Sequence, residues 1–107
     1  FAFTNFSFAQ ISNFSKDAAV WHKNAITTCG MFKKMETFDH TLMIQKLDKL
    51  KSDMEAMQNK YSENPPDSYK NDPEWEKYFE LFLDNTRIIR QRVEEKKYRL
   101  AQNYCSN

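Results

Sequence analysis

Apolar and aromatic residues recur at alternating steps of four and three along the last third of the chain. The stripe consists of Trp75, Phe79, Phe82, Thr86, Ile89, Val93, Lys97, Leu100 and Tyr104. Lys97 is its one charged member, and no glycine or proline interrupts it. Asp72, Pro73 and Glu74 precede it in an order typical of a helix start: a capping carboxylate, a residue without an N–H, and an acid near the positive end of the helix dipole. The pattern predicts one long helix over 73–104.

A second stripe with the same spacing lies upstream. Its members are Met43, Leu47, Leu50, Met54, Met57 and Tyr61. The apolar positions Met31, Met35, Phe38 and Leu42 keep this spacing but are offset by one residue, so the buried face widens or rotates near Leu42 and needs a second neighbour there. We predict a long helix over 31–61 and a linker over 62–72, which contains Pro65 and Pro66.

The segment 1–30 is expected to supply that neighbour as a shorter helical element. Ser15 can cap a helix that runs through Trp21 to Cys29, and Gly30 stands where a left-handed C-terminal cap is expected. The earlier aromatic residues follow no clear period, and we expect them in the core at the base of the bundle, with a partner interface as the alternative. They are Phe1, Phe3, Phe6, Phe8 and Phe14, with Ile11 among them.

Composition agrees with a helical fold. One glycine in 107 residues, against an average usage of about 7%, leaves few positions for the positive φ angles of hairpin turns and phosphate-binding loops. Together with the stripes, this predicts a single all-α domain over 1–107. We expect an elongated, disulfide-linked helical bundle with two long antiparallel helices and a shorter N-terminal helical segment, present as a monomer.

Cys29 and Cys105 allow two interpretations. In an oxidising compartment they predict one disulfide, and in a cytosol two unrelated buried thiols. Two long helices joined by a short linker pack antiparallel, which brings the end of the last helix beside the start of the second. The topology therefore places the two cysteines together, and we predict that they form a bridge.

Candidate chemistry is sparse. His22 and His40 have neither metal-ligand spacing nor a paired ligand nearby, and Glu94–Glu95 lies in a charged, solvated helix. We therefore expect no metal site, no cofactor and no enzymatic activity, and favour a binding role. The Met-rich stripe allows one alternative, a small secreted carrier of lipids or odorants, although Met also fills gaps between helices.

The charges nearly cancel but form blocks. Sixteen basic and fifteen acidic residues give a net charge of +1, so we expect neither nucleic acid nor a membrane surface as a partner. Seven acids face two lysines over 63–84, whereas six bases face two acids from 85 onward. One interpretation is that acids near the start of a helix and bases near its end complement the helix dipole. The alternative is that the elongated molecule has one acidic and one basic end, which would orient it on a charged protein partner.

Other features concern the compartment. The chain opens at Phe1 without an initiator methionine, as a mature secreted protein or a trimmed chain would, and we expect secretion. Asn5 and Asn13 each begin an Asn-Phe-Ser triplet, a possible glycosylation site if the chain is secreted.

Several features occur together: a Phe-rich start, the stretch Asn13-Phe14-Ser15-Lys16-Asp17-Ala18-Ala19, Trp21 ahead of Cys29, and a long charged helix ending in Asn103-Tyr104-Cys105. In this combination the chain resembles the small salivary proteins of anopheline mosquitoes that include anophensin and albicin. The resemblance implies an all-helical, disulfide-bonded protein, secreted in saliva, that blocks host defence. The albicin-like branch implies inhibition of the alternative-pathway C3 convertase of complement. The anophensin-like branch implies inhibition of kallikrein–kinin contact activation.

From this resemblance we expect a host plasma protein complex as the partner. The C3 convertase is the first candidate and the factors of the contact system are the second. The resemblance assigns no partner-binding residue on this chain.

Overall fold

The computed structural model describes residues 13–106 and folds them into helices joined by short 3-10 turns. The α-helices are α1 (Asn13–Gly30), α2 (His40–Tyr61), α3 (Trp75–Glu94) and α4 (Tyr98–Ser106). The 3-10 turns are η2 (Met31–Lys33), η3 (Met35–Thr37) and η4 (Asp67–Tyr69). Within this described range no residue is in a β-strand.

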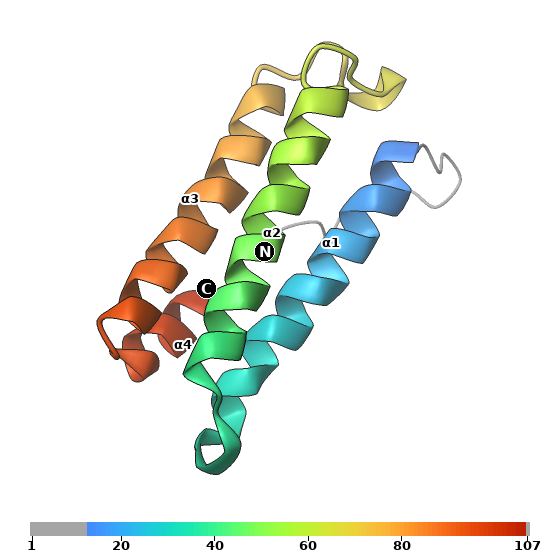
Figure 1. The fold of residues 1–107 in the computed structure, drawn as a ribbon. Coiled ribbons are helices and arrows are strands. Elements are labelled where there is room, and N and C mark those ends of the chain that lie inside the picture. Colours follow the sequence, from blue (N-terminus) through green and yellow to red (C-terminus); the bar gives the residue numbers. More distant parts are fainter. Residues whose placement is uncertain (1–12, 107) are drawn as a thin grey trace.

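The long helices run side by side along one axis. α2 packs against both α1 and α3, consecutive helices are antiparallel, and α4 turns back from the end of α3 (Figure 1). The molecule measures 45 × 22 × 20 Å. The prediction of an elongated all-α bundle with two long antiparallel helices and a shorter N-terminal helix is confirmed.

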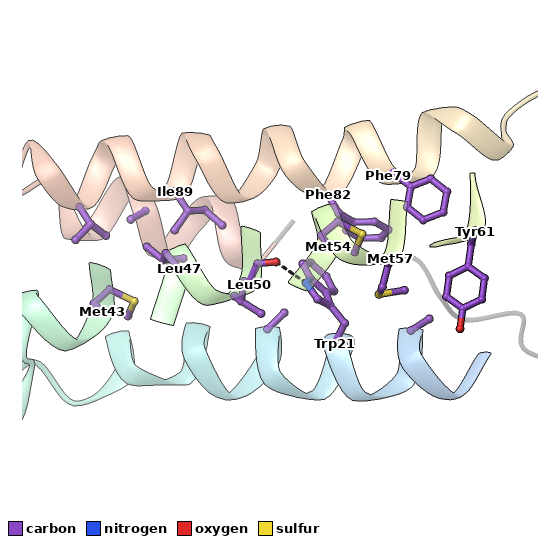
Figure 2. Close-up of a cluster of buried hydrophobic side chains, with 14 of the residues drawn as sticks. Trp21, Met43, Leu47, Leu50, Met54, Met57, Tyr61, Phe79, Phe82 and Ile89 are labelled. Carbon is purple, nitrogen blue, oxygen red and sulfur yellow. Dashed lines mark hydrogen bonds between the residues drawn. The ribbon is translucent and has the colours of Figure 1, made fainter. Parts of the chain in front are cut away.

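The predicted stripes form the core of the bundle (Figure 2). All six residues of the α2 stripe are buried, as are the six residues of the α3 stripe from Trp75 to Val93. On α1 the buried face alternates large and small side chains, with Ala18 and Ala25 one turn on either side of Trp21. The two small alanines let α1 approach the rest of the bundle closely. The indole of Trp21 therefore reaches across the core, and its ring centroid lies 5.1 Å from that of Phe82.

The second predicted helix begins later than the pattern indicated. Residues 31–39 contain η2 and η3, and α2 starts only at His40. Asp39 explains this start, because its side chain accepts a hydrogen bond of 3.0 Å from the backbone N–H of Leu42. The offset near Leu42 thus marks a helix boundary, and Met35 and Leu42 are exposed.

The prediction of one helix over 73–104 is wrong beyond Glu94. Lys96 has a φ of 58°, and the chain closes α3 by two backbone bonds, from Lys96 N to Val93 O (2.9 Å) and from Lys97 N to Arg92 O (2.8 Å). This pattern is a Schellman motif, which ends a helix by a left-handed residue. The buried position after the break is Ala101, while Leu100 is exposed. The stripe therefore shifts by one residue in α4.

Replacing Lys96 with glycine is expected to raise the free energy of unfolding by about 0.5–1 kcal/mol. A side chain at a left-handed position costs about 1–2 kcal/mol, part of which the greater freedom of glycine in the unfolded chain cancels. Urea titration measures the change. Lys96→Ala keeps the Cβ atom and serves as the control, with no stabilisation expected. A glycine variant no more stable than the alanine variant would contradict the strained turn.

Two predicted caps of α1 are also wrong. Ser15 lies within the helix, since α1 already includes Asn13. Gly30 has φ −60° and ψ −22°, a right-handed helical conformation, because the 3-10 turn η2 follows it directly. Within η2 the side chain of Phe32 is buried. The predicted N-terminal core residues Phe1 to Phe8 and Ile11 lie outside the described range.

Candidate functional site

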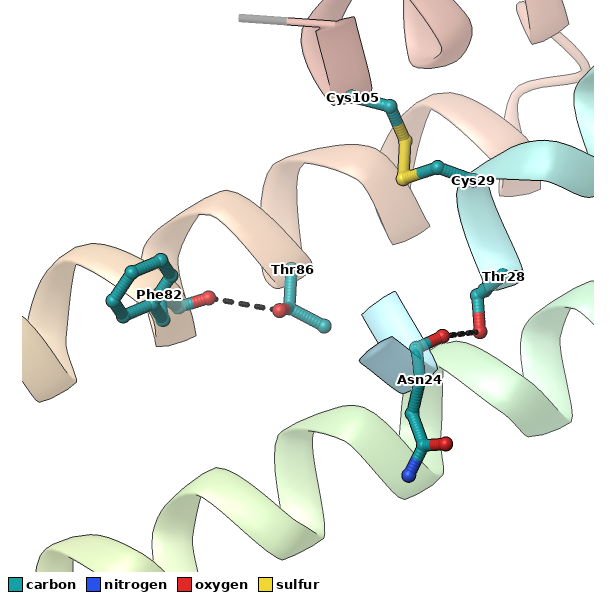
Figure 3. Close-up of a disulfide and its surroundings, with 6 residues drawn as sticks. All are labelled: Asn24, Thr28, Cys29, Phe82, Thr86 and Cys105. Atoms are coloured by element: carbon teal, nitrogen blue, oxygen red, sulfur yellow. Dashed lines mark hydrogen bonds between the residues drawn. A yellow bond between two sulfur atoms is a disulfide. The ribbon is translucent and has the colours of Figure 1, made fainter. Parts of the chain in front are cut away.

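A disulfide joins Cys29 in the last turn of α1 to Cys105 in α4 (Figure 3). The two Cα atoms are 5.9 Å apart, and 76 residues separate the cysteines in sequence. The predicted pairing is confirmed, although Cys105 arrives on α4 and not at the end of one continuous helix. Because both sulfurs are in the bridge, neither can act as a thiol nucleophile.

Aromatic side chains close the same end of the bundle. His40 and Tyr98, the first residues of α2 and α4, are joined by a hydrogen bond of 2.8 Å between Nδ1 and the phenol oxygen. The Phe38 ring lies 4.6 Å from that of Tyr98 and stacks on Phe32. His40 thus contributes to the packing of the disulfide end, through a contact that the spacing of the sequence did not reveal.

His22 lies on α1, and burial lowers its pKa. Across residues 13–106 no three His, Cys, Asp or Glu side chains gather closely enough to hold a metal ion.

A hydrogen bond and an ion pair attach the other end of α1 to α2. The hydroxyl of Tyr61 on α2 donates a hydrogen bond of 2.5 Å to Asp17, and the ammonium of Lys60 lies 3.6 Å from the same carboxylate. Burial raises the pKa of Tyr61, and the hydrogen bond to Asp17 raises it further. With the disulfide at one end and this cluster at the other, α1 is fixed to the bundle along its length.

The linker between α2 and α3 forms an acidic end. Asp67 pairs with Lys70 at 2.8 Å and Glu74 with Lys77 at 3.3 Å, so both lysines of this block are neutralised. The Lys70 ammonium lowers the pKa of the Asp67 carboxyl. Three further acids, all exposed, have no ion-pair partner among the described residues. They are Glu63, Glu76 and Glu80.

The disulfide end is basic. Lys33, Lys34, Lys96 and Arg99 are exposed there and pair with no acid of the described chain, and they outnumber the two exposed acids of this end without an ion pair, Glu36 and Asp39. Farther up α3, Arg90 joins two helices: its Nε lies 2.6 Å from Asp48 on α2, and its Nη1 contacts Glu94. The hydrogen bond to Asp48 is the main cause that raises the pKa of Arg90. The charge blocks of the sequence therefore become two oppositely charged ends of the rod.

A shallow hollow of about 130 Å³ lies between α1 and α2. Asn24, Thr27 and Thr28 line it from α1, and Lys46, Lys49 and Leu50 line it from α2. No pattern along the chain indicated this hollow, because its walls come from two helices whose relative rotation is set by packing.

The structure describes only one of the two predicted glycosylation sites. Asn5 lies outside the described residues. Asn13 is exposed as the first residue of α1, while Phe14 beside it is buried, with its ring 4.8 Å from that of Trp75. Glycosylation at Asn5 and Asn13 stays a prediction.

Among residues 13–106, no helix is both long and apolar enough to cross a membrane. No protein-family model matches the chain, and neither a curated protein nor a solved structure does. The resemblance to the anopheline salivary proteins thus remains a hypothesis.

Proposed function

We propose that this protein is a secreted salivary inhibitor of host defence that binds and blocks the alternative-pathway C3 convertase of complement, and that it is not an enzyme. The observation that carries the proposal is a rod 45 Å long whose ends have opposite charge and whose first helix is tied down at both ends. Such a surface keeps its shape on binding, so little conformational entropy is lost, and its charges orient it on a partner.

The exposed apolar side chains supply contact points for such a partner. Val20 and Ile26 on α1, Leu81 on α3 and Leu100 on α4 are each about half exposed or more. Burying apolar side chains of this kind in an interface removes apolar surface from water and so favours association. The choice of the C3 convertase comes from the sequence resemblance.

A red-cell lysis assay with only the alternative pathway active tests the proposal. We expect the protein at micromolar concentration to suppress lysis, and to leave lysis through the classical pathway unchanged. Full lysis at that concentration would eliminate the convertase as the target.

Kallikrein–kinin contact activation is the second candidate from the same resemblance. Kallikrein generation on a negatively charged surface, measured with the same preparation, distinguishes the two. Suppression there without any effect on lysis would make the contact system the target.

The carrier alternative has weaker support. Ligand pockets usually enclose about 300–1,000 Å³, whereas the hollow between α1 and α2 has about 130 Å³. Displacement of a fluorescent fatty acid would nevertheless reveal a carrier.

A further inference from the structure

Two hydroxyls and one backbone carbonyl at the hollow between α1 and α2 are already hydrogen-bonded within the protein. The hydroxyl of Thr28 donates to the carbonyl of Asn24 (2.8 Å), and that of Thr27 donates to the carbonyl of Lys23 (3.0 Å). The carbonyl of Leu50 accepts the indole N–H of Trp21 at 2.8 Å, as Figure 2 shows. These three groups offer an occupant little, so this part of the hollow favours an apolar group, while the amide of Asn24 and the ammonium of Lys46 are the polar groups that an occupant can contact.

The volume of the hollow limits how large this apolar group can be. A cavity of about 150 Å³ in a protein core can hold benzene, so 130 Å³ is enough for one side chain the size of phenylalanine or leucine. Met31, which also lines the hollow, has a flexible side chain that can adjust to either.

The rim of the hollow is positively charged. Lys46 makes no ion pair with any described residue, whereas Lys49 pairs with Asp53 at 3.1 Å. Lys23 lies one helical turn before Thr27 on α1 and is exposed. Of the charged residues that line the hollow, Lys46 alone has no ion-pair partner among the described residues, and Lys23 adds a second exposed ammonium one turn away, so the rim is net positive and favours an anionic partner.

Apolar side chains continue the surface beyond the hollow in both directions. Val20 lies two turns before Thr27 on α1 and is 62% exposed, and Leu42 lies one turn before Lys46 on α2 and is 39% exposed. Since α1 and α2 are antiparallel, the two residues lie toward opposite ends of the hollow. The hollow is therefore the centre of a strip along the rod, which suits a peptide segment better than an isolated small molecule.

We propose that this strip docks an acidic segment of a partner protein, which inserts one Phe- or Leu-sized side chain into the hollow and places its carboxylates against Lys46, Lys49 and Lys23. The assignment of a protein as the occupant rests on the function proposed above. The hollow and its charged rim are observations of the structure alone.

The test is a nuclear magnetic resonance titration of the 15N-labelled full chain with the peptide Asp-Glu-Phe-Glu-Asp, blocked at both ends. We expect binding in the millimolar range, with shifts of the amides around the hollow. Replacing the central Phe by Ala should weaken binding about tenfold, because the hollow loses its apolar occupant. A peptide with Lys in place of the acids should weaken it at least as much. Shifts elsewhere, or none at several millimolar, would overturn the proposal.

Two variants with matched controls locate the site. Thr27→Trp covers the mouth of the hollow from an exposed position, and Ile26→Trp places the same side chain about 100° around the same helix. Lys46→Glu reverses a rim charge, and Lys51→Glu makes the same change at an exposed residue of α2 that does not line the hollow. Only the first of each pair should weaken the peptide, by about tenfold and about fivefold respectively. Equal effects within a pair would contradict the assignment.

Phenylacetate, titrated alone, tests for a different occupant. It carries the ring and one carboxylate without a peptide chain, and we expect it to bind at least tenfold more weakly than the peptide. Equal affinity would assign the hollow to small aromatic acids and overturn the docking of a protein segment.

The two proposals can fail separately. If the peptide binds at the hollow but the protein does not suppress lysis, the proposed function falls and the docking site stands. If the wild-type protein suppresses lysis and Thr27→Trp and Lys46→Glu do so equally well, the strip is not the surface that meets the convertase, and this inference falls.

Discussion

Replacing both Cys29 and Cys105 by alanine is expected to lower the free energy of unfolding by about 4 kcal/mol. In the chain-entropy model, a bridge that closes a loop of this length restricts the unfolded chain by about that amount. Small domains have a total stability of about 5–15 kcal/mol, so a large share of the stability depends on this one bond. Guanidinium titration of the double variant measures the loss, and a decrease below about 1 kcal/mol would contradict it.

The loss should begin locally at α4. This helix has nine residues, and isolated helices shorter than about 12–15 residues are marginal in water. Without the bridge its main attachments are buried Ala101, the hydrogen bond between Tyr98 and His40, and a hydrogen bond of 3.2 Å from the Tyr104 hydroxyl to the side-chain oxygen of Asn85. We expect amide exchange to accelerate in α4 before the rest of the bundle opens. Single cysteine variants are the control, since each should lose as much stability as the double variant.

Trp21→Ala is the second substitution with a large expected effect, a loss of about 3–5 kcal/mol. The indole is 2% exposed, fills the gap between Ala18 and Ala25, and packs on Phe82. Its removal leaves a void that the two alanines cannot fill. It also deletes the hydrogen bond to the carbonyl of Leu50. Thermal or denaturant unfolding measures the change.

Two further variants divide this effect into its parts. Trp21→Phe keeps most of the ring volume but loses the indole hydrogen bond, and should cost about 1–2 kcal/mol. Val20→Ala changes the neighbouring exposed residue and should cost less than about 0.5 kcal/mol. If Val20→Ala cost as much as Trp21→Ala, the loss would reflect helix propensity and not core packing.

The hydrophobic stripes predicted the helices well because they are a local property of the chain. A side chain every three or four residues defines one face of a helix wherever that helix packs, so the buried residues of α2 and of α3 up to Val93 could be assigned in advance. The charged residue Lys97 was the one indication that the last stripe fails. It lies in the turn that ends α3.

The turn at Lys96 could not be predicted in the same way. Neither glycine nor proline marks it, and a lysine pays a conformational cost there. The break allows Tyr98 to contact Phe38 and His40, and Cys105 to reach Cys29. These contacts join residues 58 or more positions apart in sequence, and their combined energy outweighs the local preference for a straight helix.

The sequence by itself determined the all-α class, the buried faces of α2 and of α3 up to Val93, and the pairing of Cys29 with Cys105. Each follows from spacing along the chain or from the short linker that makes two helices antiparallel. The start of α2 follows from a local cap at Asp39, which the apolar spacing alone did not indicate. Only the tertiary structure decided where α3 ends, and that a hollow with a basic rim opens between α1 and α2. These features depend on how helices rotate and approach one another, which is set by side chains that meet from distant parts of the chain.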